Sequence, residues 1–218
     1  LGYMYEHGKG VDKDVKRAVE LYTLAADKGY AEAQLNLGTM YQIGKGVEPD
    51  DKRAVELYTL AADQGSAGAQ CDLGFMYQSG RGVEPDAERA VELYTLAAEK
   101  GDAPAQYNLG YMYQTGQGVE PDVKHVVEFY TLSADQGFAN AQFALGIMYQ
   151  FGKGVEPDSK RALELYTLAA DQRHAEAQYN LGQMYYHGQG VETDVKRALE
   201  CYTLAAKQGH ANAQYTLG

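Results

Sequence analysis

The dipeptide Leu-Gly recurs every 36 residues along the whole chain, and this period constrains the fold more than any other feature. It stands at Leu1-Gly2, Leu37-Gly38, Leu73-Gly74, Leu109-Gly110, Leu145-Gly146, Leu181-Gly182 and Leu217-Gly218, with no insertion or deletion between the copies. A fixed period of this length is typical of solenoid proteins, in which each repeat is one supersecondary unit.

One repeat, residues 31–66, predicts two helices joined by a loop. Residues 31–43 contain no proline or turn cluster, whereas GKGVEP at residues 44–49 has the glycines and proline that interrupt helices. A second helix is expected over residues 51–64, with Asp50 as its N-cap because a carboxylate accepts the free amide hydrogens of a first turn. The aspartate recurs in each repeat, as Asp14, Asp50, Asp86, Asp122, Asp158 and Asp194. Gly44 and Gly65 follow the two helices, where a left-handed residue often closes a helix.

The second helix has an apolar side and a polar side. Leu57, Tyr58 and Ala61 fall on one side at about 100° per residue. Lys52 and Glu56 fall on the other side. No single repeat can bury its apolar side alone, so neighbouring repeats must stack. The chain is therefore expected to form an all-α solenoid of helical hairpins.

The repeat carries the pattern A-x-A-Q-x-x-L-G-x-M-Y-x-x-G-x-G-V-x-x-D-x-x-x-A-x-x-x-Y-x-x-A-A-x-x-G. This pattern resembles the Sel1-like repeat family, a relative of the tetratricopeptide repeats, and the resemblance covers the whole chain. It implies a right-handed α-α superhelix whose first helices line a concave face. It also implies a scaffold or adaptor, commonly in bacterial signalling and host interaction or in eukaryotic protein quality control.

We expect one continuous array over residues 1–218, because each repeat of a solenoid contacts only its neighbours. A partial repeat at 1–30 precedes full repeats at 31–66, 67–102, 103–138, 139–174 and 175–210, and residues 211–218 begin a further one. The natural start and any targeting segment are expected to lie outside this sequence. Both ends should expose apolar surface unless something covers them, which would permit end-to-end self-association.

Charge and cysteine content limit the classes of partner and the cellular compartments that are expected for this chain. The net charge of −11 argues against a nucleic-acid partner, because a phosphate backbone requires clustered Lys and Arg. No apolar run approaches the roughly 20 residues of a membrane helix, so no membrane span is expected. Cys71 and Cys201 lie more than three repeats apart and are expected to be free thiols. Secreted relatives with a disulfide in each repeat differ from this chain, which favours the cytoplasm or a bacterial periplasm without deciding between them.

Comparison of the repeats with one another separates fixed from variable positions of the first helix. The variable positions are those of Glu32, Leu35, Asn36, Thr39, Gln42 and Ile43. They fall within one arc of about 120°, which we expect to be the concave surface. The arc carries aromatic and amide side chains and no Lys or Arg, a composition that suits a binding surface. The predicted partner-binding residues are Phe75, Tyr107, Asn108, Tyr111, Phe143, Ile147, Phe151, Tyr179, Asn180 and Gln183.

A second interpretation applies to part of this arc. The position shared by Leu35, Tyr107 and Tyr179 is alternatively half-buried between stacked repeats. Phe75 and Tyr111 lie at the centre of the arc and are better candidates for exposed anchors. Tyrosines at the two fixed positions, those of Tyr41 and Tyr58, are expected in the core, as is Leu109.

No arrangement of residues predicts catalysis, a cofactor or a metal. The GKGV loops lack the Gly-x4-Gly-Lys-Ser/Thr pattern of a phosphate-binding loop and are expected to be turns. His174 and His210 occupy equivalent junctions one repeat apart, so we expect capping or surface roles. Arg173 replaces the glycine that closes the second helix elsewhere, and a left-handed non-glycine residue costs about 1 kcal/mol. The acids Glu48 and Asp50 recur in nearly every repeat, unlike an active site.

The sequence therefore predicts a non-catalytic scaffold that holds a protein or peptide segment on its concave, aromatic- and amide-rich surface. The alternative is a carbohydrate-binding protein, because tyrosine and asparagine also suit sugar rings. An enzyme is the third interpretation, and it would require a cluster of non-repeated polar residues that the sequence does not contain.

Overall fold

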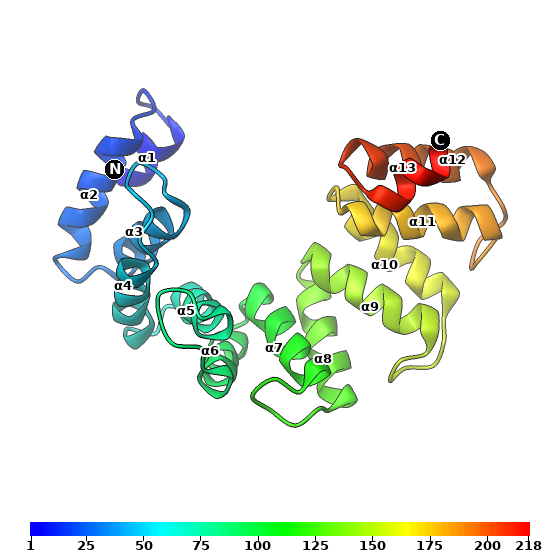
Figure 1. Cartoon of the computed structure of the whole chain (residues 1–218), viewed down its shortest axis with the longest axis horizontal. Coiled ribbons are helices and arrows are strands. Elements are labelled where there is room, and N and C mark those ends of the chain that lie inside the picture. Colours follow the sequence, from blue (N-terminus) through cyan, green and yellow to red (C-terminus); the bar gives the residue numbers. More distant parts are fainter. The chain divides into compact units, whose positions relative to one another are not determined.

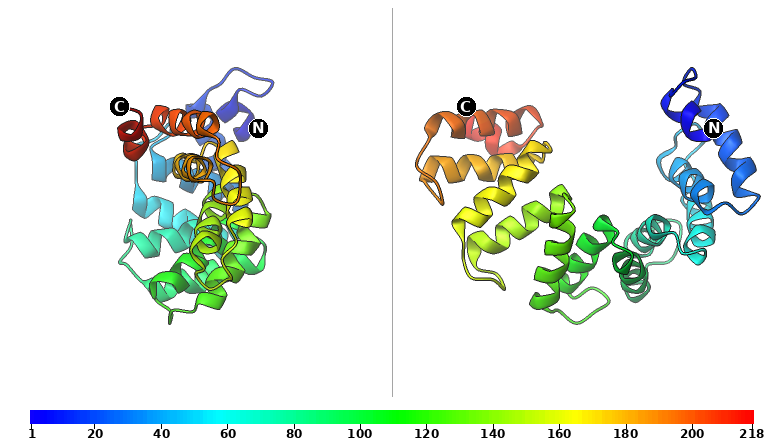
Figure 2. Two further views of the ribbon diagram at one scale, coloured as in Figure 1. Left: turned by 90° about the vertical axis from the view of Figure 1, so that its right-hand side faces the viewer. Right: turned by 180° about the vertical axis from the view of Figure 1, so that it is seen from behind.

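The computed structural model describes all residues 1–218, as helices joined by short loops with no strand (Figures 1 and 2). The first helices of the repeats are α1 (Gly2–His7), α3 (Ala31–Ile43), α5 (Ala67–Ser79), α7 (Ala103–Thr115), α9 (Ala139–Phe151), α11 (Ala175–His187) and α13 (Ala211–Leu217). The second helices are α2 (Val15–Ala26), α4 (Asp51–Asp63), α6 (Ala87–Glu99), α8 (Val123–Asp135), α10 (Ser159–Asp171) and α12 (Val195–Lys207). The all-α fold class is confirmed.

The predicted helix ends are confirmed by their caps. Helix α3 covers the predicted residues, and α4 ends one residue earlier than predicted. The Asp50 carboxylate accepts a hydrogen bond from the backbone amide of Arg53 at 3.0 Å, and the equivalent aspartate caps every other second helix. Gly44 closes α3 in the left-handed conformation, with φ of 69°.

The junctions between repeats also follow the prediction. Arg173 has φ of 65°, and it is the one non-glycine residue with positive φ. His174 and His210 are N-caps, each accepting at Nδ1 from the backbone amide of Ala177 or Ala213, at 3.2 and 3.1 Å. Both cysteines are free. No helix is long and apolar enough to cross a membrane.

Close contacts divide the chain into two compact units, each a set of hairpins with its own core. Unit 1 comprises residues 1–105 and 116–120, and unit 2 comprises residues 106–115 and 121–218. Within unit 1, α3 packs beside α4 and α4 packs against α5; within unit 2, α10 packs against α11 and α11 beside α12 (Figure 2). The expectation that residues 1–218 form one continuous array stays a prediction.

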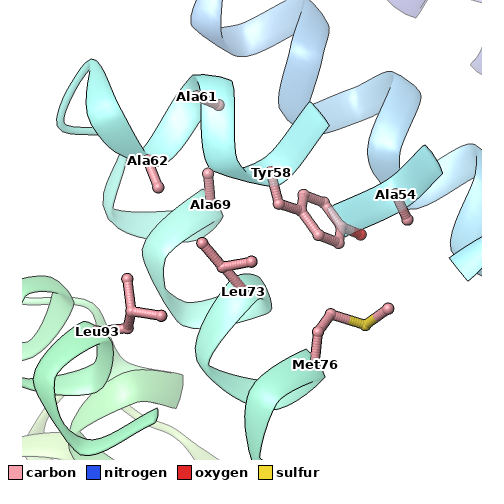
Figure 3. Packing of buried hydrophobic residues seen from close by; sticks show 8 residues of the cluster. All are labelled: Ala54, Tyr58, Ala61, Ala62, Ala69, Leu73, Met76 and Leu93. Atoms are coloured by element: carbon pink, nitrogen blue, oxygen red, sulfur yellow. The ribbon is translucent and has the colours of Figure 1, made fainter. Parts of the chain in front are cut away.

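The invariant Leu-Gly pair is explained by the hairpin core. Figure 3 shows Tyr58 of α4 among alanines of its own helix and Leu73 and Met76 of α5. A Cβ atom on Gly38 would lie 2.7 Å from Cε1 of Tyr58, so only glycine leaves room for the ring. The same glycine–tyrosine contact recurs in every hairpin from Gly2 to Gly182. The leucine of the pair is buried too, and Leu109 is only 1% exposed, as predicted.

The expectation for the fixed tyrosines is half right. Those at the position of Tyr58 are buried in all six repeats. Those at the position of Tyr41 are half-buried and pack against the core clusters from their edge, so they are peripheral rather than central to the core. Their rings lie at the edge of the hairpin over the start of the second helix, where Tyr113 stacks on His125 with ring centroids 4.6 Å apart.

Candidate partner-binding face

The predicted binding residues lie on first helices, but they belong to two units. Phe75 is on α5 of unit 1. The others are on α7, α9 and α11 of unit 2: Tyr107, Asn108, Tyr111, Phe143, Ile147, Phe151, Tyr179, Asn180 and Gln183. We call the outward sides of these first helices the first-helix face. The prediction that this face is concave concerns the whole array and stays a prediction.

Three of the predicted rings are half-buried at the contacts between neighbouring repeats of unit 2. Tyr107 stacks on Tyr130 and also touches Phe138, with ring centroids 5.4 and 5.5 Å apart. Phe143 stacks on His174 at 4.7 Å, and Tyr179 stacks on His210 at 4.6 Å. The N-cap residue of the next repeat thus covers each ring. Packing between repeats accounts for this position, as the second interpretation of the sequence proposed.

Several other predicted residues are also engaged within unit 2. Ile147 is partly buried against the core that α10 and α11 share. The side chain of Gln183 donates to the Tyr179 hydroxyl at 3.0 Å, and its Oε1 lies 3.1 Å from Nε2 of His187. Asn108 and Asn180 are half-buried beside the stacked rings. These side chains form the floor of the first-helix face.

The remaining aromatic residues stand out from this floor. Phe75 in unit 1 is 40% exposed, and in unit 2 Tyr111 is 39% and Phe151 is 63% exposed. Each is held on a 13-residue helix whose opposite side is buried. These rings are accessible without unfolding of the hairpins. They are the part of the predicted site that can contact another molecule.

One position of the predicted arc has a structural role that the sequence comparison missed. The buried hydroxyls of Tyr94 and Tyr166 donate to Oε1 of Gln78 and Gln150, at 2.8 and 2.7 Å. Tyr58 makes the same bond to Gln42. The sequence did contain evidence for this structural role, because glutamine occupies this position in four consecutive repeats. The position varies only in the terminal repeats, so it belongs to hairpin packing.

The charges of the face also differ from the sequence expectation. Asp72, beside Phe75 on α5, is half-buried, and its burial together with the nearby Asp102 carboxylate raises its pKa to about 6. The helix arc itself has no basic residue, but a loop lysine reaches it: Lys153 Nζ lies 5.9 Å from the centre of the Phe151 ring. Sequence periodicity did not find this contact because Lys153 is outside the helix. No group of three or more His, Cys, Asp or Glu side chains could hold a metal ion.

Stacked α-hairpins with accessible rings on one set of helices define a helical-repeat protein of the tetratricopeptide-like class. A model of the Sel1 repeat matches residues 1–30, 31–66, 67–102, 103–138, 139–174 and 175–210. The chain therefore belongs to the Sel1 repeat family. Proteins of this family are generally protein–protein interaction scaffolds and generally non-catalytic.

Solved structures of bacterial proteins are similar to this chain. One is c5321, a protective antigen of uropathogenic Escherichia coli strains with an SLR fold, at 39% identity and a TM-score of 0.83; the match covers 100% of this chain and 46% of c5321. The chain thus spans about half the length of that protein. Another is a Sel1 repeat protein from Oxalobacter formigenes, at 33% identity and a TM-score of 0.86, covering 94% of this chain and 82% of that one.

A more distant similarity is to the immunity protein Pa5087 from Pseudomonas aeruginosa. Its identity to this chain is 25% and the TM-score is 0.60, with 90% of this chain and 75% of that one covered. Comparison with curated proteins gave no match.

Proposed function

We propose that this Sel1 repeat protein is a scaffold that binds a protein or peptide segment on its first-helix face. The observation that carries the proposal is the set of exposed rings on otherwise buried helices. The exposed ring of unit 1 is Phe75, and those of unit 2 are Tyr111 and Phe151. Aromatic side chains offer a large contact area at low entropic cost, and they are enriched among the residues that dominate binding energy.

The floor of the face supplies the rigidity that such anchors need. In unit 2 the half-buried rings of Tyr107, Phe143 and Tyr179 are each held by a stacked neighbour. A surface that does not rearrange on binding loses less entropy when it orders a partner. Half-buried amides, such as that of Asn180, provide hydrogen-bonding groups beside the rings. A peptide has apolar side chains that can contact the aromatic rings, and backbone groups that can form hydrogen bonds with the side-chain amides.

The test uses peptides selected by phage display against the full chain, followed by titration of the chosen peptide. Double replacement of Phe75 and Tyr111 by alanine should weaken binding at least about tenfold, or ~1.4 kcal/mol. The helical circular dichroism and the melting temperature should stay nearly unchanged, because neither ring is part of a core. The matched control replaces Lys52 and Glu56 of α4 by alanine and should leave binding intact.

Two results would contradict the proposal. Unfolding of the aromatic variant would show that the rings stabilise the fold. Loss of the peptide in the Lys52 and Glu56 variant, with retention in the aromatic variant, would move the site to the second helices. A glycan array run with the same proteins tests the carbohydrate alternative: glycan binding that depends on Phe75 and Tyr111, without selected peptides, would favour sugars.

A further inference from the structure

Every second helix carries an exposed leucine at the same position of the repeat. These leucines are Leu24, Leu60, Leu96, Leu132, Leu168 and Leu204. In unit 2, Leu132, Leu168 and Leu204 are 44, 48 and 50% exposed. We call these three residues of α8, α10 and α12 the leucine row. They are as constant from repeat to repeat as the buried leucine of the Leu-Gly pair, yet they lie on the surface.

Packing within the hairpins does not explain the leucine row. None of its members belongs to a core of unit 2, and helix propensity is served equally by Ala, Lys or Glu at an exposed position. Neighbouring outward positions do change between repeats: the position of Lys52 becomes Glu88, and that of Asp63 becomes Lys207. Adjoining apolar side chains at the surface, such as Leu163 and Leu168 on α10 or Leu199 and Leu204 on α12, are typical of an interaction site.

Two members of the row border shallow apolar depressions. On α10 the side chains of Leu163, Thr167 and Leu168 line one depression, with Arg161 and Glu164 at its margin. On α12 Leu199, Thr203 and Leu204 line another, together with Glu200 and Lys207. Leu199 is itself 54% exposed, so the depression on α12 offers two exposed leucines, whereas Leu163 on α10 is partly buried against the core. Apolar side chains of a docked helix would fit such sites.

Acidic residues flank Leu132 and Leu168 on both sides, whereas Leu204 has Glu200 one turn before it and Lys207 one turn after it. Glu164 precedes Leu168 by one helical turn and Asp171 follows it by one turn. Glu128 and Asp135 flank Leu132 in the same way. Glu164 forms an ion pair with Arg161 at 2.8 Å, and Arg161 also interacts electrostatically with Asp135 of α8, whereas Asp171 forms no ion pair. Among these carboxylates, Glu128 and Asp171 are therefore available to positive charge from outside the chain.

We propose that the leucine row is a second docking surface, for a basic amphipathic helix of another protein. Leucines would bury the apolar side of that helix, and the flanking carboxylates would pair with its Lys or Arg side chains, as in other helix-in-groove complexes. A second copy of this chain fits less well, because dimerisation through the row would bring two acidic margins together in a chain of net charge −11. The surface lies on the second helices, apart from the first-helix face.

The experiment measures fluorescence anisotropy of a labelled 21-residue peptide with the full chain. The peptide has leucines at every third or fourth position and lysines beside them; a scrambled peptide of the same composition and a peptide with glutamate in place of lysine are the comparators. The lysine amphipathic peptide should bind at least about tenfold more tightly than either comparator. The triple variant L132Q/L168Q/L204Q should lower that affinity at least about tenfold.

A matched variant, K124Q/K160Q/K196Q, changes the same three helices at exposed positions and should bind the peptide at least as well as the original chain. If the leucine triple variant loses its helical signal, Leu168→Gln alone serves as the test. Equal binding by the leucine variant, or by the glutamate peptide, would overturn the proposal. So would loss of the peptide in the Phe75 and Tyr111 alanine variant, or sedimentation showing a dimer that L132Q/L168Q/L204Q dissociates.

Discussion

At the residue scale, one backbone conformation is strained. Arg173 has φ of 65°, a region in which a side chain meets the backbone of its own residue. The other repeats place glycine there, as at Gly137 with φ of 85°. The strain is local, because the position lies in the loop between α10 and α11.

We predict that Arg173→Gly raises the free energy of unfolding by about 0.5–1 kcal/mol, since the relief of strain exceeds the entropy that glycine adds to the unfolded chain. The opposite change, Gly137→Ala, should lower it by about 1 kcal/mol. No atom lies within 4 Å of the added Cβ there, so backbone strain is the only cost. Urea titrations measure both changes. A loss of stability in Arg173→Gly would mean that the arginine side chain itself stabilises the junction.

A second residue-scale feature is the half-buried carboxyl group of Asp72. Burial, with a further contribution from Asp102, raises its pKa to about 6. An aspartate in the unfolded chain has a pKa of about 3.9, so the folded protein binds this proton more tightly. The stabilising effect of the protonated group is therefore full below pH 4 and is lost as the pH rises through 6.

We predict that Asp72→Asn raises the free energy of unfolding at pH 7 by about 1–3 kcal/mol. Asparagine occupies the same position as Asn36 and Asn108 in neighbouring repeats. The difference between the variant and the original chain should shrink as the pH falls from 7 to 4.5, because protonated aspartic acid then resembles asparagine. Denaturant titrations at the two pH values measure it. A difference independent of pH would show that Asp72 is solvated and titrates normally.

At the scale of helices, buried side-chain hydrogen bonds join the same pairs of helices that pack through apolar contacts. Inside a hairpin, the tyrosine of the second helix donates to the glutamine of the first, as from Tyr166 to Gln150. Between repeats, the fixed glutamine Gln142 donates to the carbonyl of Ala134 at 3.3 Å and accepts from Gln172 at 2.8 Å. Each apolar layer is thus accompanied by polar groups with one favoured geometry, which fixes the register of the helices.

The last complete hairpin offers a natural comparison for the tyrosine bond. There Tyr186 replaces the glutamine, and the Tyr202 hydroxyl forms no such bond. We predict that Tyr166→Phe lowers the free energy of unfolding by about 0.5–1.5 kcal/mol, because it removes the bond to Gln150. Tyr202→Phe should have a much smaller effect in the same denaturant titration. Equal losses would indicate that the hydroxyl contributes through packing alone.

At the scale of the whole molecule, the repeat is the unit that can be added or removed. Second helices pack against the next first helix within each unit, as α4 does against α5 and α10 against α11. Solenoid stability is then approximately a sum of repeats and nearest-neighbour interfaces. We propose on this basis that residues 1–218 act as one array.

Removal of residues 139–174, which joins residue 138 directly to residue 175, should give a folded protein of lower stability. The slope of its free energy of unfolding against urea concentration should fall in proportion to the surface that unfolding no longer exposes. Removal of only residues 139–156 should be more damaging although it deletes fewer residues, since α10 would lose its partner α9. Circular dichroism during urea unfolding distinguishes the two. An unfolded product from the whole-repeat deletion would contradict the array.

Local signals predicted most of the fold. The aspartate caps, the glycine after α3 and the strained Arg173 depend on residues within one turn or loop, and the structure confirms them. The candidate site was less predictable. Helical periodicity gives the direction of a side chain around its own axis, but not what covers it. Phe75 and Tyr111 are exposed, whereas the variable position of Gln42 belongs to the hairpin interior.

The sequence by itself determined the period and the hairpins, because the caps and helix-interrupting residues lie within one 36-residue repeat. The buried contact of each Gly with its Tyr emerged only from the structure. Only the tertiary structure decided which outward residues remain accessible. Tyr107 is half-covered because the N-cap of the next repeat, Phe138, packs on its ring. Leu168 is 48% exposed, although it is constant, because it lies outside the core that α10 shares with α11. Burial depends on the approach of another repeat, which no pattern within a single helix specifies.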